Sequence, residues 1–167
     1  MRTGCNHRGF SLVELVIVVV IIGVIAAIAV PRISRGAKGA GDASLRGSLT
    51  GLRNAIDMYA AEHGGTFPSG ANQAAIEDKL LKTTDAAGNV GTTAGTHIYG
   101  PYLRSGFPVA PVGANKGKNT IKIVTGEPVA NAASEATGEG WIYSTDTGKI
   151  VINTDDLDEN SVAYSTY

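Results

Sequence analysis

The sequence predicts an α+β fold, in which one long N-terminal helix packs against a small antiparallel sheet of about three strands. Three observations support this. An apolar run covers residues 10–30, apolar residues recur at helical spacing over 45–59, and short alternating segments lie within 120–154. The 14 basic and 15 acidic residues nearly balance, so the composition does not indicate a nucleic-acid partner.

The apolar run begins at residue 10, and only three residues interrupt it: Ser11, Glu14 and Gly23. Its 21 residues match the roughly 20 that a helix needs to cross a bilayer. Arg2 and Arg8 precede it. Positive charge before a span predicts that the N-terminus stays in the cytoplasm and that the rest of the chain is exported.

Three kinds of N-terminal segment share this pattern: a plain anchor, a secretory signal peptide, and a prepilin leader. Residues 27–29, Ala-Ile-Ala, form a small-residue cleavage site, although the apolar run exceeds the roughly 7–15 residues usual in signal peptides. Glu14 favours the prepilin leader, because a carboxylate within a span costs about 2.5–3.5 kcal/mol and indicates a function. Cleavage between Gly9 and Phe10 would create an α-amine four residues before Glu14, on the same helix face. Glu14 would then neutralise this amine, or that of a neighbouring copy.

Residues 8–15, Arg-Gly-Phe-Ser-Leu-Val-Glu-Leu, resemble the processing site of type IV prepilins and type II secretion pseudopilins. The resemblance implies cleavage after Gly9 by a prepilin peptidase, N-methylation of Phe10, and Glu14 as the carboxylate used in filament assembly. Pro31 resembles the proline at which the long helix of this family kinks, and proline in a helix favours a kink by removing a hydrogen bond.

Residues 32–41 contain three glycines, each of which weakens a helix by about 1 kcal/mol relative to alanine. Two interpretations stay open: a flexible linker that leaves the membrane, or a stretch that bends or melts when copies pack together. We expect helical order to resume by Asp42. The apolar stripe that follows predicts the face on which the folded domain packs, and it consists of Leu45, Leu49, Leu52, Ile56 and Tyr59. Residues 63–65, His-Gly-Gly, predict the helix end.

The rest of the chain predicts a short helix over 73–82, a loop over 83–100, and strands over 120–125, 140–144 and 149–154. Trp141 and Tyr143 alternate with Ile142, which places the two aromatic residues on one face of the sheet. The turn signal at 145–148 joins the last two strands.

Residues 55–68 and 140–150 resemble the helix exit and the final hairpin of major pseudopilins. The resemblance implies a filament subunit of a type II secretion-like pseudopilus, anchored in the bacterial inner membrane with a periplasmic domain. Its implied partners are copies of itself, other pseudopilins, prepilin peptidase, an inner-membrane assembly platform and lipid. A type IV pilus subunit, and a secreted binding domain with an ordinary signal peptide, stay as alternatives.

An acidic run follows the last expected strand, at Asp155, Asp156 and Asp158. Calcium prefers six to eight oxygen ligands, and major pseudopilins bind it in a C-terminal loop, so the run is a candidate calcium site. The one cysteine, Cys5, cannot form an internal disulfide. No motif indicates an enzyme: the sequence has no nucleophile elbow and no phosphate loop after an expected strand.

These expectations divide the chain into four parts. They are a leader over 1–9, a membrane and filament-core helix over 10–30, an amphipathic helix over 31–63, and a globular, loop-rich domain with the sheet over 64–167.

Overall fold

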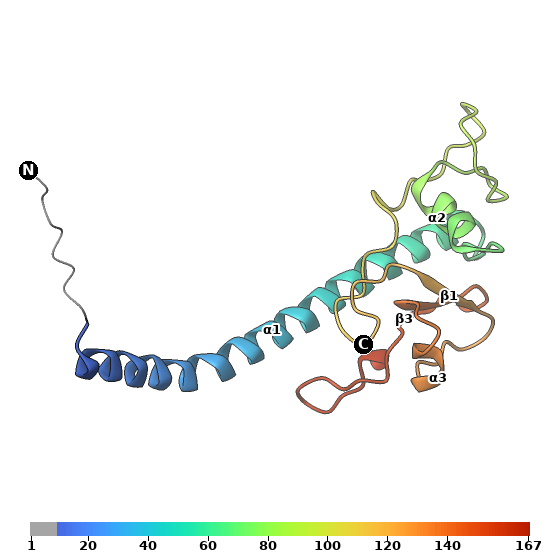
Figure 1. Ribbon diagram of the computed structural model, residues 1–167. Helices are drawn as coiled ribbons and strands as arrows, with labels where there is room; N and C mark the ends of the chain where they lie inside the picture. Colours follow the sequence, from blue (N-terminus) through green and yellow to red (C-terminus); the bar gives the residue numbers. More distant parts are fainter. Residues whose placement is uncertain (1–9) are drawn as a thin grey trace, which may run out of the picture. The chain divides into compact units, whose positions relative to one another are not determined.

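The computed structural model describes residues 10–167, and it describes only the backbone of Pro31, Ser34 and Arg35 (Figure 1). The elements in chain order are α1 (Leu12–Glu62), α2 (Gln73–Leu81), β1 (Ile121–Val124), α3 (Ala132–Glu135), β2 (Trp141–Ser144), β3 (Ile150–Ile152) and the 3-10 helix η1 (Tyr164–Thr166). The chain divides into two compact units between Gly39 and Ala40, and each is described by itself. The expected α+β class is confirmed.

Helix α1 is continuous over 51 residues, so the flexible linker that we considered for 32–41 is wrong, whereas bending or melting of this stretch when copies pack together stays a prediction. Extending a helix fixes one residue per hydrogen bond gained, whereas starting one is costly. The helical segments on both sides therefore propagate through Gly36, Gly39 and Gly41, despite the low helix propensity of glycine.

The apolar stripe of α1 is the centre of the core of the second unit, as expected. All five stripe residues are at most 2% exposed: Leu45, Leu49, Leu52, Ile56 and Tyr59. They form one cluster with Trp141 and Tyr143 of β2, Ile150 and Ile152 of β3, and Ile76 and Leu80 of α2. The predicted packing of the sheet on the helix stripe is therefore confirmed.

The sheet has the strand order β1-β2-β3, and it is mixed rather than wholly antiparallel. Strands β2 and β3 form the expected antiparallel hairpin, with Tyr143 opposite Ile150. Strand β1 runs parallel to β2, with Ile121 opposite Trp141, which corrects the expected direction. The physical reason is the connection over 125–140, which contains α3 and exceeds the dozen residues that a parallel crossover requires.

The second face of the sheet is covered by the connection around α3. Ile142 is 1% exposed but lies outside the main cluster. This agrees with the expectation that its side chain lies on the other face of the sheet from that of Trp141. The helix begins with a capping box in which the side chains of Asn131 and Ser134 each accept a hydrogen bond from the other's backbone. Asn153, itself buried, binds Ser134 through its side chain and fixes α3 to the end of β3.

The C-terminal end of α1 is closed by Gly64 and Gly65, which both have positive φ, as the helix-end signal predicts. His63 is buried there, and its ring stacks on Tyr59 at 3.9 Å between ring centroids. Its ring nitrogens lie 2.7 Å from the Tyr59 carbonyl, and 3.0 Å from both the Thr84 hydroxyl and the Asp85 carbonyl. The imidazole thus connects the helix end to the loop over 83–100.

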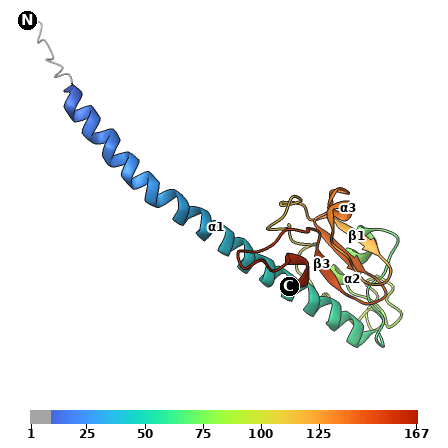
Figure 2. The same cartoon turned by 90° about the horizontal axis from the view of Figure 1, so that it is seen from below.

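The last residues of the chain lie beside α1, which both views show (Figures 1 and 2). The hydroxyl of Tyr164 in η1 donates a 2.7 Å hydrogen bond to the Asp42 carboxylate near the start of the second unit. The Arg53 guanidinium donates to the main-chain carbonyls of Tyr167 and Ile150, at 2.6 and 3.2 Å. One helix therefore holds both the sheet and the C-terminal segment.

Candidate functional site

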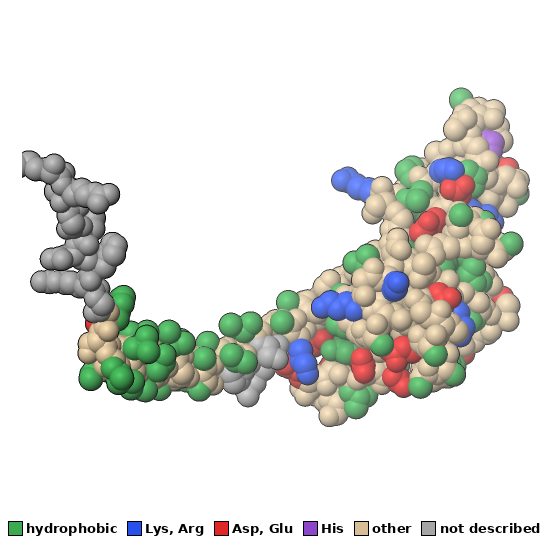
Figure 3. Space-filling model, in the orientation of Figure 1, with side chains coloured by type: hydrophobic (Ala, Val, Ile, Leu, Met, Phe, Trp, Pro, Cys, Tyr) green, Lys and Arg blue, Asp and Glu red, His purple; other side chains and the backbone are tan. Residues whose placement is uncertain are grey.

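The first part of α1 presents an apolar surface that nothing in the described chain covers. Residues Leu12–Val30 form a stretch of 19 residues that is long and apolar enough to cross a membrane, and none of it is buried. Figure 3 shows apolar side chains over this stretch of the helix. Burial of apolar side chains is the main favourable contribution to folding, so a surface of this kind indicates a lipid or protein environment.

Glu14 is the one charged residue within this apolar stretch, and it lies in the first turn of α1. A carboxylate at a helix N-terminus is stabilised by the unpaired backbone N–H groups and the helix dipole. No side chain that the structure describes forms an ion pair with it. Phe10, four residues earlier, is 82% exposed and stands just before the helix.

Two further residues of the predicted processing segment and its helix, Gly9 and Pro31, are described in part or not at all. Gly9 lies outside the described residues, so the cleavage site is described only on its Phe10 side. Residue 31 is within the continuous helix α1, but the Pro31 side chain also lies outside the described part, and its kink stays a prediction.

The acidic run is not gathered into a ligand cluster in the structure. Asp155 and Asp156 are exposed, and no group of three metal-binding side chains occurs among the described residues. Asp158 instead accepts hydrogen bonds from the backbone N–H groups of Asn160 and Val162 and from the Tyr167 hydroxyl, at 2.7, 2.8 and 2.6 Å. The described residues do not gather a calcium ligand set, so calcium binding stays a prediction on which the proposed function does not depend.

Those hydrogen bonds change the acidity of the groups involved. The Tyr167 hydroxyl, followed by the Val162 N–H, stabilises the charged form of Asp158 and lowers the pKa of its carboxyl. The same contact raises the pKa of Tyr167. The loop over 155–163 is therefore attached to Tyr167 through Asp158.

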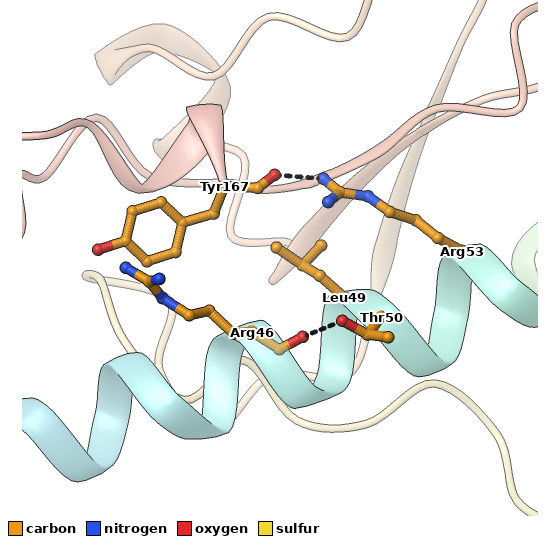
Figure 4. A pocket seen from close by; sticks show the side chains of 5 residues that line it. All are labelled: Arg46, Leu49, Thr50, Arg53 and Tyr167. Carbon is orange, nitrogen blue, oxygen red and sulfur yellow. Dashed lines mark hydrogen bonds between the residues drawn. The ribbon is translucent and has the colours of Figure 1, made fainter.

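One pocket of the second unit was not predicted from the sequence. Arg46, Leu49, Thr50 and Arg53 of α1 line it together with Tyr167 (Figure 4). The Arg46 guanidinium carbon lies 4.4 Å from the centroid of the Tyr167 ring, a cation–π contact. In the sequence, Arg46 and Arg53 are visible only as polar residues off the apolar stripe. The pocket could not be predicted from them, because its other wall is Tyr167, more than 100 positions later in the sequence.

Comparison with protein families finds one match, to a prokaryotic N-terminal methylation motif, over residues 5–30. The matched segment contains Gly9, Phe10, Glu14 and the exposed apolar stretch of α1. This match indicates a type IV pilin-like segment and a substrate of prepilin peptidase. No curated protein and no solved structure shows significant similarity to the chain.

Proposed function

We propose that this chain is a structural subunit of a type II secretion-like pseudopilus. One observation carries the proposal: an apolar helix with no cover in the described chain bears a single carboxylate, Glu14, near its start, inside the segment that matches the methylation motif. The prepilin peptidase would cut between Gly9 and Phe10, and Phe10 would then be N-methylated.

In this function the first part of α1 uses one apolar surface in two environments. Before assembly, residues 10–30 lie in the inner membrane, with the N-terminus in the cytoplasm and residues 31–167 in the periplasm. During assembly the same residues pack against the helices of other copies in the core of the filament. Both environments exclude water, so the apolar side chains remain covered throughout.

The cleavage supplies a partner for the carboxylate. Glu14 is unfavourable in lipid without an opposite charge, and the new α-ammonium at Phe10 provides one. Pairing with the amine of a neighbouring copy would also set the relative position of helices whose other side chains are all apolar or small. An uncut leader would place polar and charged residues where the helix ends must meet.

The second unit would form the outer surface of the filament, which supports protein export as a piston or plug. Its contacts would include copies of itself, other pseudopilins and an inner-membrane assembly platform. Nothing in the described structure indicates a catalytic site, and the proposed role requires none.

Two features support a pseudopilus over a type IV pilus. The helix exit at Tyr59–Pro68 and the hairpin that carries Trp141 have the sequence features of major pseudopilins. Residues 6–167 also contain no cysteine, whereas many adhesive pilins close a C-terminal loop with a disulfide. Deletion of the gene should therefore stop export of secreted proteins and leave surface pili unchanged. Loss of surface pili with normal export would assign the subunit to a pilus.

Substitution of Glu14 tests the assembly mechanism. We expect Glu14→Ala to insert into the membrane normally and to reduce filament yield more than about tenfold, because an unpaired buried charge costs about 3–5 kcal/mol. Val18→Ala, in the same helix, serves as the matched control with near-normal yield. Quantification of sheared filaments by immunoblot gives the measurement. Normal yield from Glu14→Ala would remove this residue from the mechanism.

A further inference from the structure

The pocket at Arg46 contains an exposed guanidinium that forms no ion pair with the described side chains, although Tyr167, Asp158 and Asp42 stabilise its charge from nearby. Arg46 is exposed and stacks on Tyr167, and a cation–π contact leaves the edge of the guanidinium available to donate hydrogen bonds. Among the described side chains the ion pairs are Lys82–Asp78 and Lys149–Glu127, so Arg46 has no ion-paired carboxylate among them.

The two carboxylates nearest to this pocket are already bound by neutral donors. Asp42 accepts from the Tyr164 hydroxyl, and Asp158 accepts from the Tyr167 hydroxyl and two backbone N–H groups. Asp158 thereby holds Tyr167, which lines the pocket. Neither carboxylate forms an ion pair with the Arg46 guanidinium, which stays exposed to a ligand from outside the chain.

The pocket is held in shape by Arg53. Its guanidinium binds the main-chain carbonyls of Tyr167 and Ile150, which fixes the Tyr167 ring beside Arg46 (Figure 4). Leu49, at 2% exposed, forms an apolar floor. A ligand that fits this pocket combines a carboxylate with an apolar group.

The same chain presents such a ligand on the loop over 155–159. Asp155, Asp156 and Glu159 are exposed, and none of their carboxylates is hydrogen-bonded among the described residues. Leu157, between them, is 56% exposed. The loop is attached to the pocket through the hydrogen bond from the Tyr167 hydroxyl to Asp158, and none of its free acids forms an ion pair with Arg46. The chain thus carries a basic pocket and an acidic loop that are complementary in charge but form no ion pair with each other.

We propose that the pocket formed by Arg46, Leu49 and Tyr167 receives the acidic loop 155–159 of a neighbouring copy of this chain. A contact in which each copy offers its pocket to one neighbour and its loop to another is head-to-tail, and repeated head-to-tail contacts form a helical filament. Opposite charges at such a contact fix its register and disfavour wrong partners. The inference rests on the proposed function, and it places a contact of the filament in the second unit.

Cysteine cross-linking in the full-length chain tests this contact. In a Cys5→Ser background, Arg46→Cys combined with Asp156→Cys should give a ladder of disulfide-linked multimers after oxidation in native membranes. Each single-cysteine variant can give dimers at most. Monomers alone, or a double variant that stops at dimers, would overturn the head-to-tail contact.

Charge reversal provides the second readout. Arg46→Glu should reduce filament yield at least about two- to fivefold, the range expected for losing one exposed ion pair. Asp155→Lys with Asp156→Lys should do the same, and the combined variant should recover most of the wild-type yield. Arg104→Glu, at an exposed arginine elsewhere on the unit, is the matched control, and circular dichroism checks that each variant folds.

The outcomes separate this inference from the proposed function. A wild-type chain that forms no filament contradicts the proposed function. Wild-type filaments that Arg46→Glu leaves unchanged, or a combined reversal that does not recover yield, contradict the contact alone. Equal loss from Arg46→Glu and Arg104→Glu would show a general charge effect and would also overturn it.

Discussion

The two parts of the chain, residues 10–39 and 40–167, differ most in what their apolar side chains contact. In the second part, the stripe of α1, the sheet and α2 bury one another in a single cluster. In the first part, the apolar stretch Leu12–Val30 is wholly uncovered within the described chain. The same helix is therefore covered by its own chain over one part and uncovered over the other. The proposed move of the subunit from lipid into a filament core would require this difference.

The largest expected effect is on solubility. A fragment over residues 40–167 should be soluble without detergent and should unfold in one cooperative thermal transition, because its core includes no residue before Leu45. The full chain should require detergent or lipid. Calorimetry and sedimentation of the fragment check this. A fragment that aggregates or melts without cooperativity would show that the second part depends on the first.

Apolar substitutions in the two parts should differ in their effect on the free energy of unfolding of the second part. Trp141→Ala in the fragment should lower the free energy of unfolding by about 3–5 kcal/mol, because a fully buried indole leaves a cavity and an unpaired Pro108 carbonyl. In the full chain in detergent, Ile21→Ala should change the unfolding of the second part by less than about 0.5 kcal/mol. Denaturant titration followed by circular dichroism gives both values. Comparable losses would contradict the independence of the two parts.

The helix exit should show a smaller and more local effect. His63→Phe keeps a ring on Tyr59 but removes the contacts to Thr84 and Asp85, which should cost about 1–3 kcal/mol. Hydrogen exchange should speed up mainly in the loop over 83–100. His97→Ala, in that loop, is the control with little effect. Uniform acceleration over the whole unit would show that His63 supports the core rather than the loop.

Alkaline pH should weaken the second part through its buried tyrosines. Burial raises the pKa of Tyr143, whose hydroxyl donates to the Pro68 carbonyl at 2.9 Å. A raised pKa in the folded state means that its stabilisation is complete below the ordinary tyrosine value of about 10 and is lost as pH rises above it. Tyr143→Phe should cost about 1 kcal/mol at pH 7 and flatten the decline above pH 10. Parallel curves for the two proteins would exclude this role of Tyr143.

Much of the second part could be predicted because burial leaves a periodic pattern in the sequence. The stripe from Leu45 to Tyr59 and the alternation around Trp141 identified the core and the strands. The direction of β1 could not be predicted in the same way, because alternation reports which face is buried and not which way a strand runs. The sequence left a linker open at residues 32–41, because the low propensity of glycine does not show that a helix propagates through these residues from both ends.

Of the candidate functional features, Glu14 could be predicted from the sequence and the pocket at Arg46 could not. Glu14 stands out in the sequence because a charge within an apolar run is rare and costly. The pocket at Arg46 does not, since its tyrosine lies at the other end of the chain and is held by a long-range contact from Arg53 to Tyr167. Asn131 could have indicated the start of α3, because asparagine is one of the residues preferred at a helix N-cap.

Mass spectrometry of the mature N-terminus, on protein from native membranes, tests the central claim most directly. The account predicts a chain that starts at Phe10 with one methyl group on its α-amine. A chain that starts near Val30 would contradict it, because removal of residues 10–30 would leave neither the apolar helix nor Glu14 for a filament.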